Sequence, residues 1–285
     1  MNIEYVSHLP RGLPSKARVY ALAAPRAGAK PLRDLAASLG LGAAPAELSS
    51  STWAVGAQVG RWSLAMHRAS GALRAMHLDR YGEGDGQPFE LSDRRAQRAA
   101  DRFVAALGLL PKGEAKALAV THLRQGGGAP EGGKADERIL DAGVVYGRFI
   151  DGLPVVGPGG MAMVNVAGDG EVVGARRIWR GLGRGVATVK LRPAQWAVET
   201  FEAALAKGVL GDVRVLKAQL GYLEFGELDR QSLIEPVYAF VYAVQHGEVA
   251  SKHVHVLHAG DKAHGRLMGR RRFVAPKQRA RKTQG

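Results

Sequence analysis

The chain has 285 residues, of which 46% are hydrophobic and 6% aromatic. This content allows one large domain or two to three small ones with buried cores, and excludes disorder as the default interpretation. The absence of cysteine excludes a disulfide framework, thiolate zinc sites and a cysteine nucleophile. Of the net charge of +14, +8 lies in residues 266–285, so the remaining chain carries only +6 and shows no obvious phosphate-binding design.

The N-terminal part predicts one helix among short strands. Strands are expected at 17–24, 51–57, 61–68 and 72–79. Leu32, Leu35, Ala36 and Leu39 recur with the spacing of one helical face before Gly40. Residues 81–88 are rich in glycine and acid, so we expect a boundary there, and a first unit over residues 17–82.

The middle part predicts a second unit over residues 92–182. Ser92 is suited to cap a helix whose apolar stripe is Ala96, Ala99, Phe103 and Leu107. Strands are expected at 116–124, 143–150, 160–166 and 171–180, with a glycine-rich linker at 125–133.

A third unit is predicted over residues 190–260. Pro193 suits the first turn of a helix that buries Ala197, Phe201, Ala204 and Leu205. Strands follow at 213–224, 234–245 and 252–259. The sequence therefore predicts an α+β fold of three consecutive units, each with one helix packed on a three- to four-stranded antiparallel sheet. The basic stretch 266–285 is expected to be a flexible tail.

Two groups of turn residues stand out in the middle unit. Gly152, Pro154 and Gly157 interrupt an apolar run, because proline lacks an N–H and glycine adopts conformations denied to other residues. We expect them to fold neighbouring strands back on each other. Asp169 and Gly170 then predict a tight hairpin.

The stretch VVYGRFIDGLPVVGPGGMAMVNVAGDGEVVGARRIW, at 144–179, resembles the PepSY and FTP modules in the propeptides of thermolysin-like metalloproteases. The matching residues are Gly152, Pro154, Val155, Gly157, Asp169 and Gly170. The strands with Leu220-Gly221-Tyr222 and Pro236-Val237-Tyr238 are similar to the closing part of this superfamily and of YycI, an accessory regulator of a sensor kinase. The resemblance covers about residues 92–259 and implies a PepSY/cystatin-like fold.

This resemblance implies a non-catalytic, extracytoplasmic accessory protein of the cell envelope that acts by protein-protein contact on a sensor or secreted protein. An exposed sheet face or edge would provide the contact. The N-terminus has no apolar stretch of the length that a secretory signal needs, and no run of about 18 apolar residues occurs anywhere. The sequence therefore leaves the compartment open and predicts a soluble chain without a transmembrane segment.

The alternative is a nucleic-acid-binding accessory protein that uses its tail. Phe273 adjoins the basic residues, and arginine with an aromatic ring can follow a phosphate backbone and stack on a base. Anionic lipid or cell-wall polymer would suit the same charge. The tail residues in question are Arg266, Arg270, Arg271, Arg272, Lys277, Arg279, Arg281 and Lys282.

Catalytic and cofactor signatures are weak. His253 and His255 would point the same way from a strand and, with His258, suggest a metal site, but no further ligand has a fixed spacing, so we expect no metal or other cofactor. Glu224, Glu227, Asp229 and Glu235 surround a predicted loop, where solvation would keep their pKa values together. With no P-loop, nucleophile elbow or zinc-protease helix, the sequence predicts a protein that is not an enzyme.

Overall fold

A computed structural model describes residues 2–41, 48–83, 89–126, 137–209, 211–247 and 249–267. Within these residues it contains three helices, α1 (Ala29–Ser38), α2 (Asp93–Ala106) and α3 (Ala194–Ala206). Each helix buries the stripe that its sequence predicts, for example Leu32, Leu35 and Ala36 in α1. Ser92 does precede α2, but its carbonyl accepts the Ala96 N–H while its side chain makes no capping hydrogen bond.

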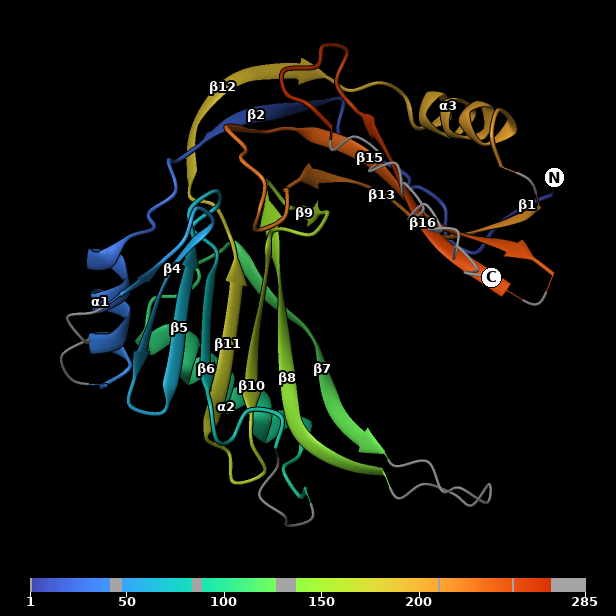
Figure 1. The fold of residues 1–285 in the computed structure, drawn as a ribbon. Coiled ribbons are helices and arrows are strands. Elements are labelled where there is room, and N and C mark those ends of the chain that lie inside the picture. Colours follow the sequence, from blue (N-terminus) through green and yellow to red (C-terminus); the bar gives the residue numbers. More distant parts are fainter. Residues whose placement is uncertain are drawn as a thin grey trace, which may run out of the picture.

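Most of the described strands belong to one 13-stranded sheet (Figure 1). From one edge to the other the strands are β16 (Val249–His258), β15 (Pro236–His246), β13 (Asp212–Leu223), β9 (Leu153–Val156), β8 (Glu137–Ile150), β10 (Met161–Val166), β11 (Val172–Ile178), β6 (Leu73–His77), β5 (Trp62–His67), β4 (Ala54–Val59) and β3 (Ser49–Ser50). Two more strands join from the side, β1 (Ile3–Tyr5) beside β13 and β7 (Ala115–Gly126) beside β8. A separate three-stranded sheet has the order β12 (Leu182–Lys190), β2 (Lys16–Leu22), β14 (Leu233–Ile234).

The large sheet has two lobes. The first lobe is β3 to β6 with β7, β8, β10 and β11, and the second lobe is β1, β9, β13, β15 and β16. They are continuous because β8 pairs with β7 over most of its length and then, at Phe149 and Ile150, with β9. Strand β9 in turn lies parallel to β13. A strand of only four residues therefore connects the two lobes by backbone pairing.

The prediction of three separate helix-and-sheet units is wrong. Strand β6 of the predicted first unit pairs with β11 of the second, so these two sheets are one. The N-terminal strands β1 and β2 pair instead with β13, β12 and β14, far along the chain. Edge strands offer free N–H and C=O groups, and here they pair with other segments of the same chain rather than ending three small sheets. The result is a sheet-dominated, mixed architecture in place of the PepSY/cystatin-like α+β units.

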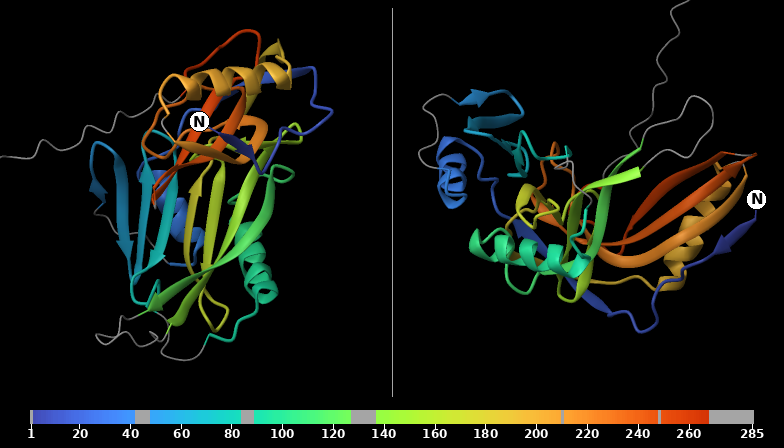
Figure 2. Two further views of the ribbon diagram at one scale, coloured as in Figure 1. Left: turned by 90° about the vertical axis from the view of Figure 1, so that its right-hand side faces the viewer. Right: turned by 90° about the horizontal axis from the view of Figure 1, so that it is seen from below.

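The helices cover only one face of the large sheet. Helix α1 packs on β4 and β5, α2 on β8 and β10, and α3 on β13 and β15, each over its own apolar cluster. The small sheet lies on the same side, where Tyr20 and Ile234 pack against Ile150 and Tyr222. Figure 2 shows all three helices on the same side of the strands when the molecule is seen from below. Among the described residues, no helix covers the other face of the first lobe.

The turn between β8 and β9 explains the interruption in the apolar run. Asp151 and Gly152 both have positive φ, 50° and 79°, as the two central residues of a type I′ hairpin require. Pro154 lies in β9 opposite Phe149, whose N–H donates instead to the Glu114 carbonyl at 2.7 Å. Proline was expected to be unable to continue an interior ladder, but Phe149 and Pro154 form a non-hydrogen-bonded pair, so the β8–β9 ladder needs no N–H from Pro154.

Candidate functional site

The uncovered side of the first lobe carries methionines and arginines in register. Val145, Met163, Arg176 and Arg74 lie side by side across β8, β10, β11 and β6. Two further methionines lie in neighbouring rows and point the same way because strand side chains alternate. We call this surface the open face and define it by Arg74, Met76, Val145, Met161, Met163 and Arg176.

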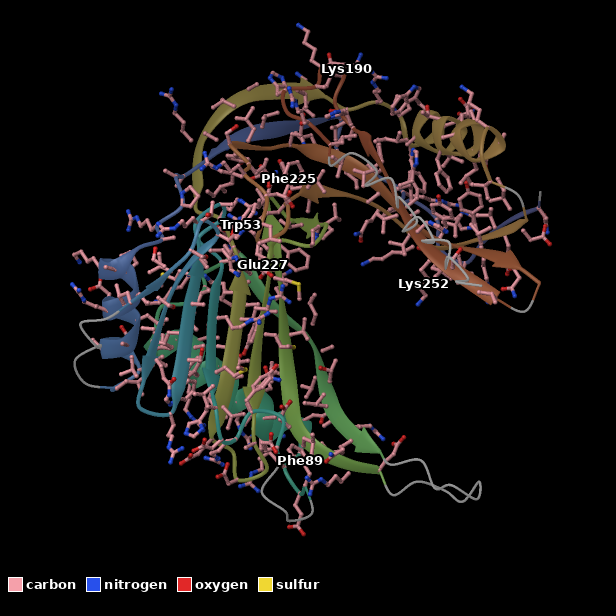
Figure 3. The ribbon with its side chains drawn as sticks, in the orientation of Figure 1. Trp53, Phe89, Lys190, Phe225, Glu227 and Lys252 are labelled. Atoms are coloured by element: carbon pink, nitrogen blue, oxygen red, sulfur yellow. The ribbon has the colours of Figure 1, made fainter. Side chains whose placement is uncertain are left out.

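Exposed leucines flank the open face. Leu118 of β7 is 60% exposed, and Leu228, in the segment after β13, is 48% exposed. Leu228 and Met161 line a hollow of about 410 Å³ together with Arg176 and Glu227. Figure 3 shows Glu227 close to the junction between the two lobes. Large apolar side chains left in water beside a hollow are typical of a contact surface.

Glycines shape the open face by letting side chains lie across the backbone. A Cβ on Gly147 would come within 2.5 Å of the Leu118 side chain, and one on Gly174 within 2.6 Å of the Tyr81 ring. A side chain at either position would displace Leu118 or Tyr81, which therefore form part of the surface above the strands.

The charges of the open face are unevenly paired. Arg176 forms an ion pair with Glu227 at 3.0 Å, and His67 lies 3.9 Å from the same carboxylate. Arg74 is exposed, and among the described residues no carboxylate lies within ion-pair distance of it. The open face thus presents a free positive charge among its methionines.

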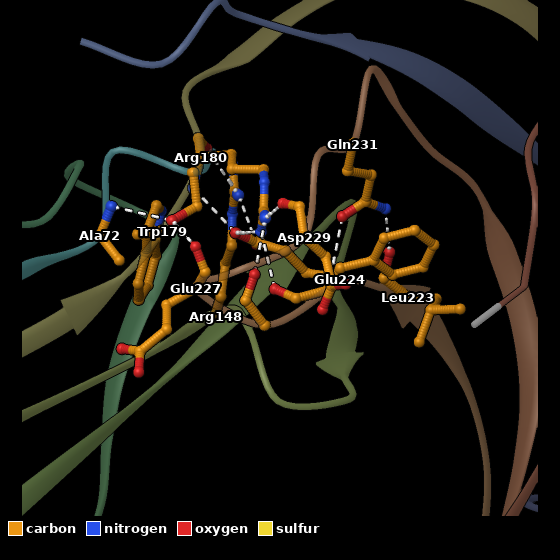
Figure 4. A network of polar contacts seen from close by, with 12 residues as sticks. Ala72, Arg148, Trp179, Arg180, Leu223, Glu224, Glu227, Asp229 and Gln231 are labelled. Atoms are coloured by element: carbon orange, nitrogen blue, oxygen red, sulfur yellow. Dashed lines mark hydrogen bonds and ion pairs between the residues drawn. The ribbon is translucent and has the colours of Figure 1, made fainter. Parts of the chain in front are cut away.

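A buried polar network joins the two lobes (Figure 4). The fully buried Glu224 carboxylate, directly after β13, pairs with Arg148 of β8 at 2.9 Å and accepts the Arg180 N–H at 2.8 Å. The Arg180 side chain donates to the carbonyls of Phe225 and Gly226. Burial raises the pKa of Glu224, whereas the positive charge of Arg148 opposes that rise. Such a buried network is stable only when its carboxylate and its arginines are both present.

Glycines allow the chain to reach this network. The segment after β9 runs against the Glu224 backbone, where the Gly159 N–H donates to the Glu224 carbonyl at 3.0 Å. A Cβ on Gly157 would lie 2.7 Å from that carbonyl oxygen, and one on Gly159 would lie 2.3 Å from the Phe225 carbonyl oxygen. Gly157, singled out in the sequence as a turn residue, thus belongs to the junction between the lobes.

The remaining predicted turn residues lie at two separate hairpins. Gly152 and Pro154 are at the β8–β9 hairpin, while Asp169 and Gly170 are in the turn between β10 and β11. Asp169 accepts hydrogen bonds from the Glu171 N–H and from Arg80. The structure does not bring these two turns into one site, and their roles are local.

The histidines do not converge. His253 and His255 lie on the α3 side of β16, where their rings approach Tyr242 at 5.3 Å and Phe201 at 5.5 Å. His258 has the opposite parity and lies 3.4 Å from a Glu235 carboxylate oxygen. The described part of the chain holds no group of three or more His, Asp or Glu side chains that could bind a metal ion.

The basic tail lies largely beyond the described residues. Only Arg266 of the predicted polyanion-binding set is described, and it is exposed. The others, Arg270, Arg271, Arg272, Lys277, Arg279, Arg281 and Lys282, fall outside the described residues.

The sequence did not reveal the junction. Glu224 and Glu235 were expected in a solvated loop, but they are 0% and 6% exposed. The available signal was an arginine inside an apolar run, Arg148 in YGRFI, and another at the end of RRIWR, Arg180. A charged residue in such a run is compatible with burial only if a partner of opposite charge is near, and the sequence did not identify that partner.

The comparisons with known proteins give a fold and no function. No family model matches the chain, and no curated protein matches it. The crystal structure of an uncharacterized protein from Eubacterium rectale ATCC 33656 is similar, with a TM-score of 0.61 and 12% sequence identity over 93% of this chain and 91% of that one. At this identity the likeness concerns the fold alone. In the described residues, no helix has both the length and the apolarity needed to cross a bilayer.

Proposed function

We propose that the protein is a non-catalytic binding module and that a partner protein docks on its open face. The observation that carries the proposal is the one-sided cover of the sheet: three helices and the small sheet lie on one face, and the other face presents methionines and exposed leucines. Covering a sheet face of this composition with a second apolar surface is favourable, because both surfaces are then removed from water.

The chemistry of the open face indicates what kind of partner fits. Methionine is flexible and polarisable, so a surface built from Met76, Met161 and Met163 adapts to more than one apolar shape. Arg74 has no carboxylate partner among the described residues, so a carboxylate on the partner would complete an ion pair there. The partner is therefore expected to present an apolar patch with an acidic residue beside it.

Site-specific photo-crosslinking tests this proposal. A photoreactive phenylalanine derivative replaces Leu228 or Leu118 in the full chain, which is expressed in the organism of origin and irradiated. We expect one discrete protein adduct at each position, because a docked partner lies within reach of the photoreactive group. We expect Arg74→Glu to reduce the yield of this adduct, because the new carboxylate would repel the acidic residue of the partner.

Val186 provides the matched control. It lies on β12, away from the open face, and is 44% exposed, close to the 48% of Leu228. The same label at Val186 should give no such adduct. Equal adducts at Val186 and Leu228, or none at Leu228 and Leu118, would overturn the proposal.

A further inference from the structure

Two adjoining hollows lie on the other side of the sheet, beside the junction of the lobes. The first, of about 340 Å³, lies between the segment after β2, the turn at Ser70 and Gly71, and the end of α2 at Leu109. The second, of about 570 Å³, extends from the same segment to residues 230–232. Ala23, Ala24 and Pro25 line both, so the two hollows adjoin each other.

The charged side chains that line these hollows are all arginines. Arg26, Arg177 and Arg180 line the first, Arg68 and Arg230 line the second, and no aspartate or glutamate lines either. Arg180 is paired with Glu224 in the junction. For the other four, the described part of the chain offers no carboxylate within ion-pair distance. The two hollows therefore concentrate positive charge that described carboxylates balance only at Arg180.

Arg177 has an unsatisfied buried donor. Its Nη1 donates to the Leu109 carbonyl at 3.1 Å, but its Nε is buried without a hydrogen-bond partner. Burial lowers the pKa of Arg177, with the charge of Glu224 opposing that effect. The Nε of Arg180 is likewise buried and unpartnered. Buried donors without an acceptor cost free energy, which indicates that the positive charge of these two arginines is incompletely satisfied within the described residues.

Backbone groups also line the first hollow. Gly71 has a φ of 70° and lies close to the segment after β2, since a Cβ there would be 3.5 Å from the Arg26 backbone N. The N–H groups of Ala24 and Arg26 donate to no acceptor of the described residues. The segment thus adds two backbone donors to the guanidinium groups that line the hollow.

We propose that these hollows are one binding site for a small polyanion with two or more phosphate or carboxylate groups. Guanidinium groups bind both kinds of anion through paired N–H donors, and two adjoining hollows suit a ligand with more than one charged group. The site is independent of the proposed protein-binding function, because it lies on the opposite side of the sheet from the open face. Its position places the ligand against residues 68–69 of the first lobe, between β5 and β6, and against residues 230–232, which follow β13 of the second lobe.

Calorimetric titration of the full chain tests the proposal. Tripolyphosphate and citrate are the two probes, so that the result distinguishes phosphate from carboxylate recognition. Arg26 and Arg230 are exposed and make no contact that the fold needs, so the double variant Arg26→Gln/Arg230→Gln should fold. We expect it to lose affinity for the preferred probe at least about tenfold, since hydrogen bonds to charged groups are removed. Arg177→Gln, measured separately, should lose a similar factor.

A matched control separates the site from general charge. Arg94 and Arg98 are exposed on α2 and do not line the hollows, so Arg94→Gln/Arg98→Gln removes the same charge elsewhere. This control should retain nearly the full affinity. The proposal is overturned if neither probe binds at millimolar concentration, if both double variants lose affinity equally, or if neither does, because the basic tail would then account for the binding.

Discussion

Single residues determine how the two lobes are held together. Arg148 and Glu224 are fully buried, and the charge of Arg148 is balanced by Glu224 at 2.9 Å and by Glu114 at 2.7 Å. Arg180 adds a second positive group and connects the carboxylate to the carbonyls of the following segment. Removing one charge from this set should therefore lower the free energy of unfolding more than removing an exposed charge.

Glu224→Gln should lower the free energy of unfolding by about 3–5 kcal/mol, because it leaves Arg148 with Glu114 alone and removes the carboxylate that pairs with the buried Arg180. Urea unfolding followed by circular dichroism measures this. The control is Glu4→Gln, which removes an exposed carboxylate 3.3 Å from Arg214 and should cost less than about 1 kcal/mol. Equal effects of the two variants would contradict the role given to the junction.

The sequence pattern predicted the buried stripes of the helices but not the buried carboxylate of the junction. The stripe Leu32, Leu35 and Ala36 and the stripe Ala197, Phe201 and Leu205 are buried as their spacing indicates. The burial of Glu224 was not predictable from its neighbours, because an acid after a strand is ordinarily solvated and its partner Arg148 is 76 residues away.

At the scale of elements, the sequence predicted where the strands lie in the chain better than it predicted which strands pair. The segments that form β5, β6, β10 and β11 alternate or end in turn residues, and each lies close to its expected position. The pairing of β6 with β11 and of β1 with β13 depends on which free edges meet in three dimensions. Local periodicity carries no information on that, so the expected three small sheets were wrong.

The segment between β9 and β10 also depends on a close approach of two backbones. Gly159→Ala should destabilise the protein by about 1–3 kcal/mol, because its Cβ would lie 2.3 Å from the Phe225 carbonyl oxygen and would force the two segments apart. Thermal unfolding measured by calorimetry gives the change. Gly208→Ala is the matched control, since no atom lies within 4 Å of a Cβ there, and it should be nearly neutral. A neutral Gly159→Ala would show that the two segments can separate freely.

At the scale of the whole molecule, the account depends on a continuous sheet whose two faces differ. One face carries the helices, the small sheet and the arginine-lined hollows, and the other carries the open face. The connection through β9 and the junction at Glu224 fix the lobes relative to each other. The second hollow combines residues 68–69 of the first lobe with residues 230–232, which follow β13 of the second lobe, so it keeps its shape only if the lobes do not move independently.

The most direct measurement is the distance between the lobes in solution. The chain has no cysteine, so two spin labels can be attached cleanly to Leu118→Cys in the first lobe and Val254→Cys in the second, where the native residues are 60% and 63% exposed. Pulsed electron resonance should give one narrow distance distribution for the full chain, broadened by Glu224→Gln. A broad or two-peaked distribution in the otherwise native chain would contradict a sheet that holds both lobes as one body.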